Sequence, residues 1–279
     1  MTPHPFDQAA RLHQQPDGSF LGATQPAYAN MVGPFGGITA AVLLQAVLQH
    51  PQRLGEPIAL TVNFAGAVAD GPFTVNARPV RTNRSTQHWV VELTQPGAHS
   101  KDGQDGQPQV ATTATVVTAV GRSTWGECEV PMPAVPAPDA VPQAQMTGGV
   151  AWLDRYAMHL ISGGVPQQWD GRSAPSLTRM WVRDAPARTP DFASLAALAD
   201  VFFPRIWLRR ATRVPVGTVS MTVYFHCSAA RLAAVGSGHL LAEARGQAFS
   251  HGFFDQTGLL WAADGALLCS THQTVYYKE

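Results

Sequence analysis

Asp200 is the residue whose surroundings in this sequence are least typical of its type. It lies within the run Leu195–Phe203, LAALADVFF, in which all of the remaining residues are apolar. The run predicts a helix, and a carboxylate on an apolar helix needs a partner or takes a raised pKa. Both conditions are common in general bases. The alternative is an ordinary aspartate of the last helical turn, solvated or bonded to a nearby backbone N–H.

Two adjacent glycines, Gly36 and Gly37, begin a second apolar run that predicts a helix over 36–50. Unsatisfied N–H groups and the positive end of the helix dipole attract negative charge to such a terminus. Glycine also lets a ligand approach the backbone closely. The pair therefore predicts either a binding site for a polar group or a tight contact between helix and sheet.

Several familiar catalytic motifs are missing from the sequence. It contains no GxSxG, no GxGxxG, no Walker A loop and no HExxH. The histidines show no metal-ligand spacing, and His226 and Cys227, adjacent in a predicted strand, would point to opposite faces. We therefore expect no metal site.

The composition is that of a globular, charge-balanced protein. Of 279 residues, 45% are hydrophobic and 14% are charged, which favours a large core. Lys plus Arg and Asp plus Glu both number 19, so we expect neither a nucleic-acid partner nor a polybasic membrane surface. Cys128, Cys227 and Cys269 are too few for a disulfide framework, which favours a reducing, cytoplasmic location. No apolar run is long enough to enter and span a membrane, and the first residues show no secretory signal.

Proline content divides the chain near its middle. Residues 130–142 contain five prolines, which favour an extended linker because proline fixes φ and lacks an N–H. We predict an N-terminal domain over 1–125, a linker over 126–149 and a C-terminal domain over 150–279. The polar segment 97–109 predicts a hairpin loop.

The two predicted domains share one plan. Each has an apolar helix, at 36–50 and at 191–203, followed by four strands. The predicted strands are 58–65, 73–82, 87–95 and 110–120 in the first half, and 218–226, 239–249, 252–262 and 266–277 in the second. Further strands are expected around 18–28 and 152–182. Thr61–Phe64 (TVNF) parallels Thr222–Phe225 (TVYF). The pattern predicts two copies of a helix with a four-stranded antiparallel meander, joined side by side through their sheets.

The ordered set of motifs resembles the double-hotdog acyl-CoA thioesterases of the thioesterase II type. The resemblance implies an α+β fold of two tandem hotdog repeats, each an antiparallel sheet wrapped around a central helix. It covers nearly the whole chain and rests on the segments 33–41 (GPFGGITAA), 84–87 (RSTQ), 195–200 (LAALAD), 220–226 (SMTVYFH), 264–265 (DG) and 270–273 (STHQ).

The resemblance also implies an activity, the hydrolysis of an acyl-CoA by activated water. Asp200 would be the base, with Gln273, Ser220 and Thr222 positioning the water, because an amide such as Gln273 both donates and accepts. The alternative for Gln273 is a polar residue on the solvent face of a strand. The Gly36 and Gly37 amides would polarise the thioester carbonyl.

Four more residues are predicted to contact the substrate. They are Phe35 beside an acyl channel, Arg84 on a CoA phosphate, and Ser85 and Gln87 as hydrogen-bonding groups at the pocket mouth. The alternatives are core packing for Phe35 and an ordinary hairpin corner for the other three. The resemblance implies acyl-CoA as the substrate, no metal or redox cofactor, a homo-oligomer, and a role in fatty acid metabolism.

One position departs from the family pattern. The thioesterase II type has an aspartate before the strand that corresponds to Met221–His226, where this sequence has Ser220. Serine needs an activator before it can act as a base. An alternative function is therefore a non-catalytic acyl-CoA or lipid-binding hotdog protein. A hotdog hydratase or dehydratase, which would use an Asp/His pair, is a second alternative.

Overall fold

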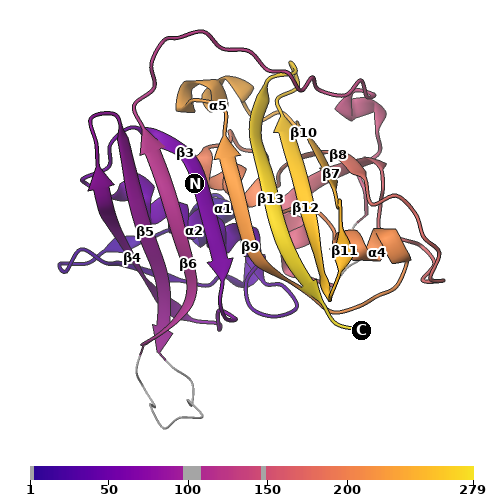
Figure 1. The fold of residues 1–279 in the computed structure, drawn as a ribbon, viewed down its shortest axis with the longest axis horizontal. Coiled ribbons are helices and arrows are strands. Elements are labelled where there is room, and N and C mark those ends of the chain that lie inside the picture. The colour runs from indigo at the N-terminus through magenta and orange to yellow at the C-terminus, as the bar shows by residue number, and fades with distance from the viewer. Residues whose placement is uncertain (1–2, 97–107, 146–148) are drawn as a thin grey trace.

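A computed structural model describes residues 3–96, 108–145 and 149–279, so most of the predicted 97–109 loop lies outside the described residues. One antiparallel sheet curves around two helices that lie against its inner face (Figure 1). This arrangement confirms the predicted α+β fold. The elements of the first half are α1 (Pro5–Ala9), β1 (His13–Gln14), β2 (Phe20–Ala23), η1 (Pro26–Tyr28), α2 (Gly36–Gln49), β3 (Glu56–Phe64), β4 (Pro72–Thr82), β5 (Thr86–Pro96) and β6 (Pro108–Ala119).

The second half repeats the plan with insertions. Its elements are η2 (Pro138–Ala140), η3 (Ala151–Arg155), β7 (Tyr156–Ser162), β8 (Thr178–Asp184), α3 (Phe192–Leu198), α4 (Arg205–Arg210), β9 (Val216–Phe225), α5 (Ala229–Val235), β10 (Leu240–Arg245), β11 (Phe249–Ser250), β12 (Phe253–Trp261) and β13 (Leu267–Tyr277). The predicted strands are confirmed to within a few residues, except that 239–249 is divided between β10 and β11. The predicted helix 191–203 is shorter, because α3 ends at Leu198. The helices α4 and α5 were not predicted.

The predicted meander is wrong for the first strand after each helix. The strand order is β1-β2-β4-β5-β6-β3-β9-β13-β12-β10-β8-β7, with β11 beside β12. Thus β3 pairs with β6 and not with β4, and β9 pairs with β13 and not with β10. The free edges of β3 and β9 then pair with each other, which joins the two halves as predicted and removes both edges.

The junction between the halves is symmetric. Thr61 and Thr222 are register partners, and their Oγ1 atoms are 3.0 Å apart. The residues on either side follow the same rule, since Ala59 pairs with Tyr224 and Asn63 pairs with Ser220. A local two-fold axis therefore passes between Thr61 and Thr222, the two residues at which the sequence similarity begins.

The two central helices bring the halves into one core. All of α2 from Gly37 to Leu44 is buried, as expected for a helix that is apolar nearly all round. Helix α2 packs against α3, whose residues Phe192–Leu198 are all buried. The contact between these helices places the start of α2 near the end of α3.

The proline-rich segment is extended, as predicted, and it packs against the outer face of the second half (Figure 1). The indole Nε1 of Trp181 donates to the Pro136 carbonyl at 2.8 Å. The Nε1 of Trp261 donates to the Val130 carbonyl at 3.4 Å. The linker therefore covers apolar surface of β8, β10 and β12 instead of acting as a free spacer.

Candidate active site

Asp200 and Gln273 meet between the end of α3 and the inner face of β13. Asp200 lies in the turn after α3, where its N–H donates to the Ala197 carbonyl at 3.1 Å. Gln273 is 3% exposed and its Nε2 donates to Asp200 Oδ1 at 2.8 Å. The structure thus brings together the two residues that the sequence singled out separately. It also places Gln273 on the buried face of its strand instead of the solvent face.

The beginning of α2 closes over the same carboxylate. A Cβ on Gly36 would lie 2.8 Å from Asp200 Oδ2, and a Cβ on Gly37 would lie 2.6 Å from the Ala197 carbonyl oxygen. A hydrogen bond from the Gly37 backbone stabilises the Asp200 carboxylate. The two glycines therefore permit a tight contact, which is closest with the end of α3 and the turn after it and not with the sheet, and Gly37 directs its amide at Asp200. A role of this helix start in binding the substrate stays a prediction.

The environment of Asp200 sets its pKa. Burial raises this pKa to about 7, and the hydrogen bonds from Gln273 and from the Gly37 backbone act in the opposite direction. A carboxyl group that titrates near neutral pH is suited to accept and release a proton under ordinary conditions.

A threonine that sequence reasoning missed completes this group. Thr218 Oγ1 donates to Gln273 Oε1 at 3.4 Å, so the Gln273 amide lies between Thr218 and Asp200. The Gln273 Nε2 also lies 3.4 Å from the Met221 sulfur. These contacts fix the orientation of the amide, with its nitrogen toward the carboxylate.

A β-bulge brings Thr218 to the inner face. Ser220 pairs with Thr274, but the next pair joins Thr218 to Val275, so Val219 is the extra residue. Strict alternation from the buried Met221 would have placed Thr218 on the outer face. The polar residues at 218–222 were the available signal, but the bulge that selects Thr218 among them is not visible in the sequence.

Ser220 and Thr222 do not reach the carboxylate, which is contrary to the prediction. They alternate with Met221 and Val223, whose side chains are buried in the core, and they therefore lie on the outer face. The Thr222 hydroxyl contacts Thr61 across the junction of the halves. The departure from the family pattern at Ser220 consequently lies outside the group around Asp200.

The predicted contacts at Arg84, Ser85 and Gln87 lie at the other end of the sheet. Phe64, at the end of β3, lies against Gly36. Ala119 of β6 pairs both with Thr86 and with Glu56, the first residue of β3, so Thr86 lies level with the start of β3. Eight residues of strand separate these positions by about 25 Å.

The buried Gln87 has a structural role in that distant corner. Its amide accepts from the Leu54 N–H at 2.8 Å and donates to the Gln52 carbonyl and to Thr82 Oγ1. The Ser85 carbonyl accepts from the Val120 N–H, and Arg84 is exposed. The hairpin-corner alternative therefore describes these three residues.

Phe35 forms a wall behind the first turn of α2. Its ring stacks on Trp152 with centroids 4.3 Å apart and planes at 9°, and it meets Tyr156 edge-on at 6.0 Å. Because Phe35 comes from the first half and Trp152 from the second, this stack holds the start of α2 in place across the two halves.

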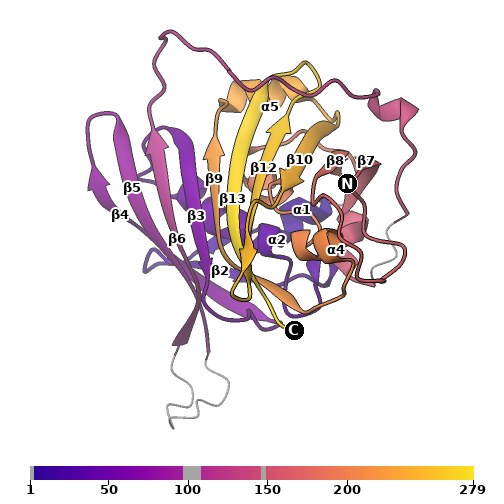
Figure 2. The same ribbon diagram turned by 45° about the vertical axis from the view of Figure 1, so that its right-hand side comes forward.

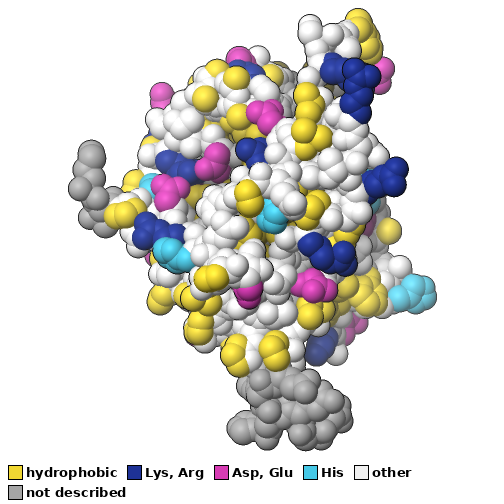
Figure 3. Space-filling model, turned by 90° about the vertical axis from the view of Figure 1, so that its left-hand side faces the viewer, with side chains coloured by type: hydrophobic (Ala, Val, Ile, Leu, Met, Phe, Trp, Pro, Cys, Tyr) yellow, Lys and Arg dark blue, Asp and Glu magenta, His cyan; other side chains and the backbone are white. Residues whose placement is uncertain are grey.

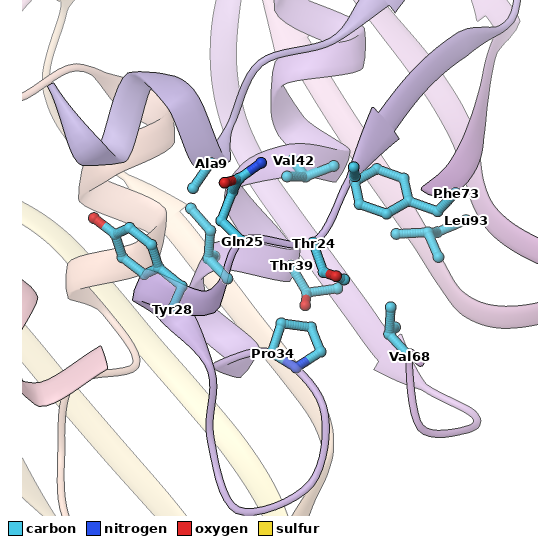
Figure 4. A pocket seen from close by; sticks show the side chains of 12 residues that line it. Ala9, Thr24, Gln25, Tyr28, Pro34, Thr39, Val42, Val68, Phe73 and Leu93 are labelled. Atoms are coloured by element: carbon cyan, nitrogen blue, oxygen red, sulfur yellow. The ribbon is translucent and has the colours of Figure 1, made fainter. Parts of the chain in front are cut away.

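A small apolar pocket lies on a neighbouring flank of α2 (Figure 4). Thr39 and Val42 of α2 line it together with Phe73 of β4 and Leu93 of β5. Viewed along the axis of α2, the residues that line this pocket lie about a third of a turn away from Gly36. It offers about 20 Å³ of free space, which is room for about one water molecule and not for an acyl chain.

The first half does not repeat the polar group. By the strand register, Pro57 occupies the place of Thr218 and Val116 occupies the place of Gln273. The same bulge occurs in both halves, at Ile58 and at Val219. One half of the duplication therefore carries the polar side chains, and the other contributes the glycines of α2.

The residues that the structure describes contain neither a cluster of side chains suited to a metal ion nor a helix suited to span a membrane. Among them, no three or more His, Cys, Asp or Glu side chains are grouped so as to hold a metal ion. No helix of the described segments combines the length and the apolar character needed to cross a membrane.

Comparisons with known proteins give a consistent picture. Residues 19–119 match the family model described as the acyl-CoA thioesterase N-terminal domain, and residues 132–277 match that of the acyl-CoA thioesterase C-terminal domain. No curated protein matched the sequence.

Solved structures match over the whole chain. A conserved protein of unknown function with a hot dog fold from Alicyclobacillus acidocaldarius is 43% identical, with a TM-score of 0.91 over 100% of this chain and 99% of that one. A putative thioesterase II from Thermobifida fusca is 19% identical, with a TM-score of 0.81 and full coverage of both chains. An acyl-CoA thioesterase II, TesB2, from Mycobacterium marinum is 15% identical, with a TM-score of 0.72 over 98% of each chain. The fold is thus the double hotdog that the sequence predicted.

Proposed function

The chain belongs to the acyl-CoA thioesterase family, and from that premise we propose that it hydrolyses an acyl-CoA to the free acid and CoA. The observation that carries the proposal is the buried Asp200 carboxylate, which has a pKa of about 7 and is held by Gln273 at the beginning of α2. This arrangement provides a base, a group that orients it and a source of positive potential in one place.

In the proposed first step, water attacks the carbonyl carbon of the thioester and transfers a proton to Asp200. Gln273 fixes the direction of the carboxylate because its Nε2 donates to Oδ1, while Thr218 fixes the amide in turn. The remaining N–H groups in the first turn of α2, together with the helix dipole, stabilise the negative charge that develops on the carbonyl oxygen.

In the second step, the tetrahedral intermediate collapses. The carbon–sulfur bond breaks, the carbonyl re-forms, and the proton held by Asp200 moves to the departing CoA sulfur. Asp200 is then ionised again and ready for another water. The mechanism requires no metal or redox cofactor. The homo-oligomer, the cytoplasmic location and the role in fatty acid metabolism stay predictions.

The test is a free-thiol release assay with acyl-CoAs from acetyl to palmitoyl and one aromatic acyl-CoA. We expect turnover by the unchanged protein and a loss of about 100-fold or more for Asp200→Asn. Ser220→Ala is the matched control, because Ser220 lies on the outer face of β9, and it should retain activity.

Two outcomes would contradict the proposal. Full activity in Asp200→Asn would show that another group is the base. Saturable binding of acyl-CoA without release of thiol from any substrate would favour the non-catalytic binding protein.

A further inference from the structure

The corner of the second half around α4 concentrates positive charge. Its exposed cations are Arg172, Arg209, Arg210, Arg213 and Lys278. Two carboxylates accompany them, Asp170 paired with Arg172 and Glu279 paired with Arg210. Five cations against two carboxylates leave an excess of three positive charges, although the whole chain has a formal net charge of zero.

This excess is local. In Figure 3, which shows the face over the first half, Lys and Arg alternate with Asp and Glu and no area of one sign stands out. In Figure 2, α4 and the loop between β7 and β8 lie on the opposite, right-hand side. The cations around α4 therefore offer an anionic ligand an attractive area of a kind that the face in Figure 3 does not show.

A solvent-open hollow of about 270 Å³ lies within the cationic corner. The loop between β7 and β8 forms one wall, with Gly164 and Arg172, and Leu208 of α4 forms another. The loop is attached to the helix by backbone hydrogen bonds, from the Gly171 N–H to the Ala211 carbonyl and from the Ala174 N–H to the Arg209 carbonyl, both at 3.2 Å. The hollow thus has fixed walls.

An aromatic and cationic pair stands beside the hollow. Trp169, next to the lining residue Asp170, is half-buried, and the Arg213 guanidinium lies over its ring at 4.8 Å from the centroid. Trp207 supports the same ring edge-on at 5.9 Å. Indole rings and guanidinium planes are surfaces on which nucleobases stack, and guanidinium groups also bind phosphate in bidentate fashion.

The corner is within reach of Asp200. Ile206 of α4 and Val275 of β13 belong to one apolar cluster, and Val275 is two residues from Gln273 on the same face of the strand. The distance from Gln273 to Val275 along the strand, added to the length of α4, places the exposed arginines of α4 roughly 15 Å from the Asp200 carboxylate. An extended phosphopantetheine arm spans a separation of that order.

We propose that this corner, formed by Arg172, Arg209 and Arg213 around the hollow, binds the 3′-phosphorylated adenosine diphosphate end of CoA. The inference rests on the proposed function for the identity of the substrate. Its phosphates carry several negative charges for the arginines, and its adenine offers a flat face for the hollow beside Trp169. This assignment replaces Arg84 as the phosphate contact expected from the sequence.

The first test uses adenosine 3′,5′-bisphosphate in a calorimetric titration of the full chain. We expect saturable binding that weakens about tenfold in Arg209→Gln/Arg213→Gln and also in Arg172→Gln/Arg213→Gln. The second pair leaves untouched the contacts of Arg209 with Ser173 and Ala174, so it guards against a folding defect. Arg84→Gln is the control and should bind like the unchanged protein. No binding by the unchanged protein, equal binding by all variants, or a loss confined to Arg84→Gln overturns the proposal.

The second test compares an acyl-CoA with the same acyl group on N-acetylcysteamine, which lacks the nucleotide. The arginine variants should raise the KM for acyl-CoA about tenfold, leave kcat unchanged, and leave hydrolysis of the truncated substrate unaffected. A fall in kcat with both substrates overturns the proposal. So does an effect seen only with an acyl group on an acidic carrier protein. If no thioester is hydrolysed, the proposed function fails while the bisphosphate titration still decides the nucleotide site.

Discussion

At Asp200, opposing effects hold the pKa of the carboxyl group near 7. Burial penalises the charged form and raises the pKa, while the Gln273 amide and the Gly37 backbone favour the ionised form. Burial without these hydrogen bonds would keep the carboxyl protonated and useless as a base, and the hydrogen bonds in a wet site would make the carboxylate too weak a base. The partners of Asp200 thus set its strength as well as its direction.

The pKa of Asp200 makes the first prediction. Because a base must be deprotonated, kcat/KM for an acyl-CoA should rise with pH through a single ionisation near 7 and level off above it. The measurement is a pH–rate profile from pH 5 to 9 with a saturation curve at each point. A profile that is flat between pH 5.5 and 8.5 would exclude Asp200 as the base.

Thr218 gives a second prediction, because it acts through Gln273. Thr218→Val keeps the shape of the side chain but removes the hydroxyl that donates to Gln273 Oε1. The loss of one hydrogen bond of about 1 kcal/mol should lower kcat about five- to tenfold and shift the apparent pKa of the pH–rate profile. Thr222→Val on the outer face is the matched control and should change kcat less than about twofold. Equal effects of the two substitutions would mean that Thr218 has no positioning role.

At the scale of elements, the sequence predicted those features that depend on local patterns. The apolar run of α2, the alternation within most strands and the isolated carboxylate at Asp200 are all local, and each was found. That the two halves join through their sheets was also expected, because free sheet edges can pair, but the strands that form the junction, β3 and β9, were not named. The shortened α3 was not expected, and Pro204 does not account for it, because proline restricts Phe203 whereas α3 ends at Leu198.

Features that depend on register were beyond the sequence. The bulge at Val219 reverses which residues of β9 face the core, so Thr218 points inward while Ser220 and Thr222 point outward. Nothing in the types of these residues distinguishes one bulge position from another. The error at Gln87 has a similar cause, because a turn between strands can lie at either end of a sheet.

The close approach of α2 to the turn after α3 leads to a third prediction. Gly36→Ala places a methyl group 2.8 Å from Asp200 Oδ2, which must move the carboxylate or the helix. We expect kcat to fall about tenfold or more because the geometry of the site is altered, and the melting temperature to fall modestly because the close contact must be relieved. Gly66→Ala is the control, because a Cβ there meets no atom within 4 Å. Activity of Gly36→Ala equal to that of Gly66→Ala would show that the contact is not needed.

At the scale of the whole molecule, the two similar halves contribute different parts of the candidate site. The second half supplies Asp200, Gln273 and Thr218, whereas the first half supplies the helix start at Gly36. Because β3 pairs with β9 and one apolar core extends through both halves, neither half holds a complete site alone. The site therefore exists only when the whole chain is folded, and any strain at the site is felt in the stability of the whole chain.

The stability of the molecule should accordingly depend on the charge of Asp200. Its pKa is about 7 in the folded protein and close to 3.8 when unfolded, so the unfolded chain releases this proton first. Stability is then lost as pH rises from about 4 to about 7, and this loss persists at higher pH. Asp200→Asn removes the loss, and Asn can still accept the bond from Gln273. The variant should be inactive yet more stable at pH 8, by about 1 kcal/mol or more and a few degrees in Tm, with no gain at pH 4.

Asp255 provides the opposite case for the same measurement. Burial acts to raise the pKa of Asp255, but hydrogen bonds from the Ala248 and Gln247 backbones and from His272 outweigh it and hold this pKa below its usual value. Its contribution to stability is present at neutral pH and is lost as pH falls through the lowered pKa. Asp255→Asn should therefore lower Tm at pH 8, where Asp200→Asn raises it, in thermal unfolding followed by circular dichroism at pH 4 and pH 8. If Asp200→Asn lowered Tm at pH 8 as well, the ionised Asp200 would stabilise the fold, which would contradict the prediction that keeping this base buried lowers stability.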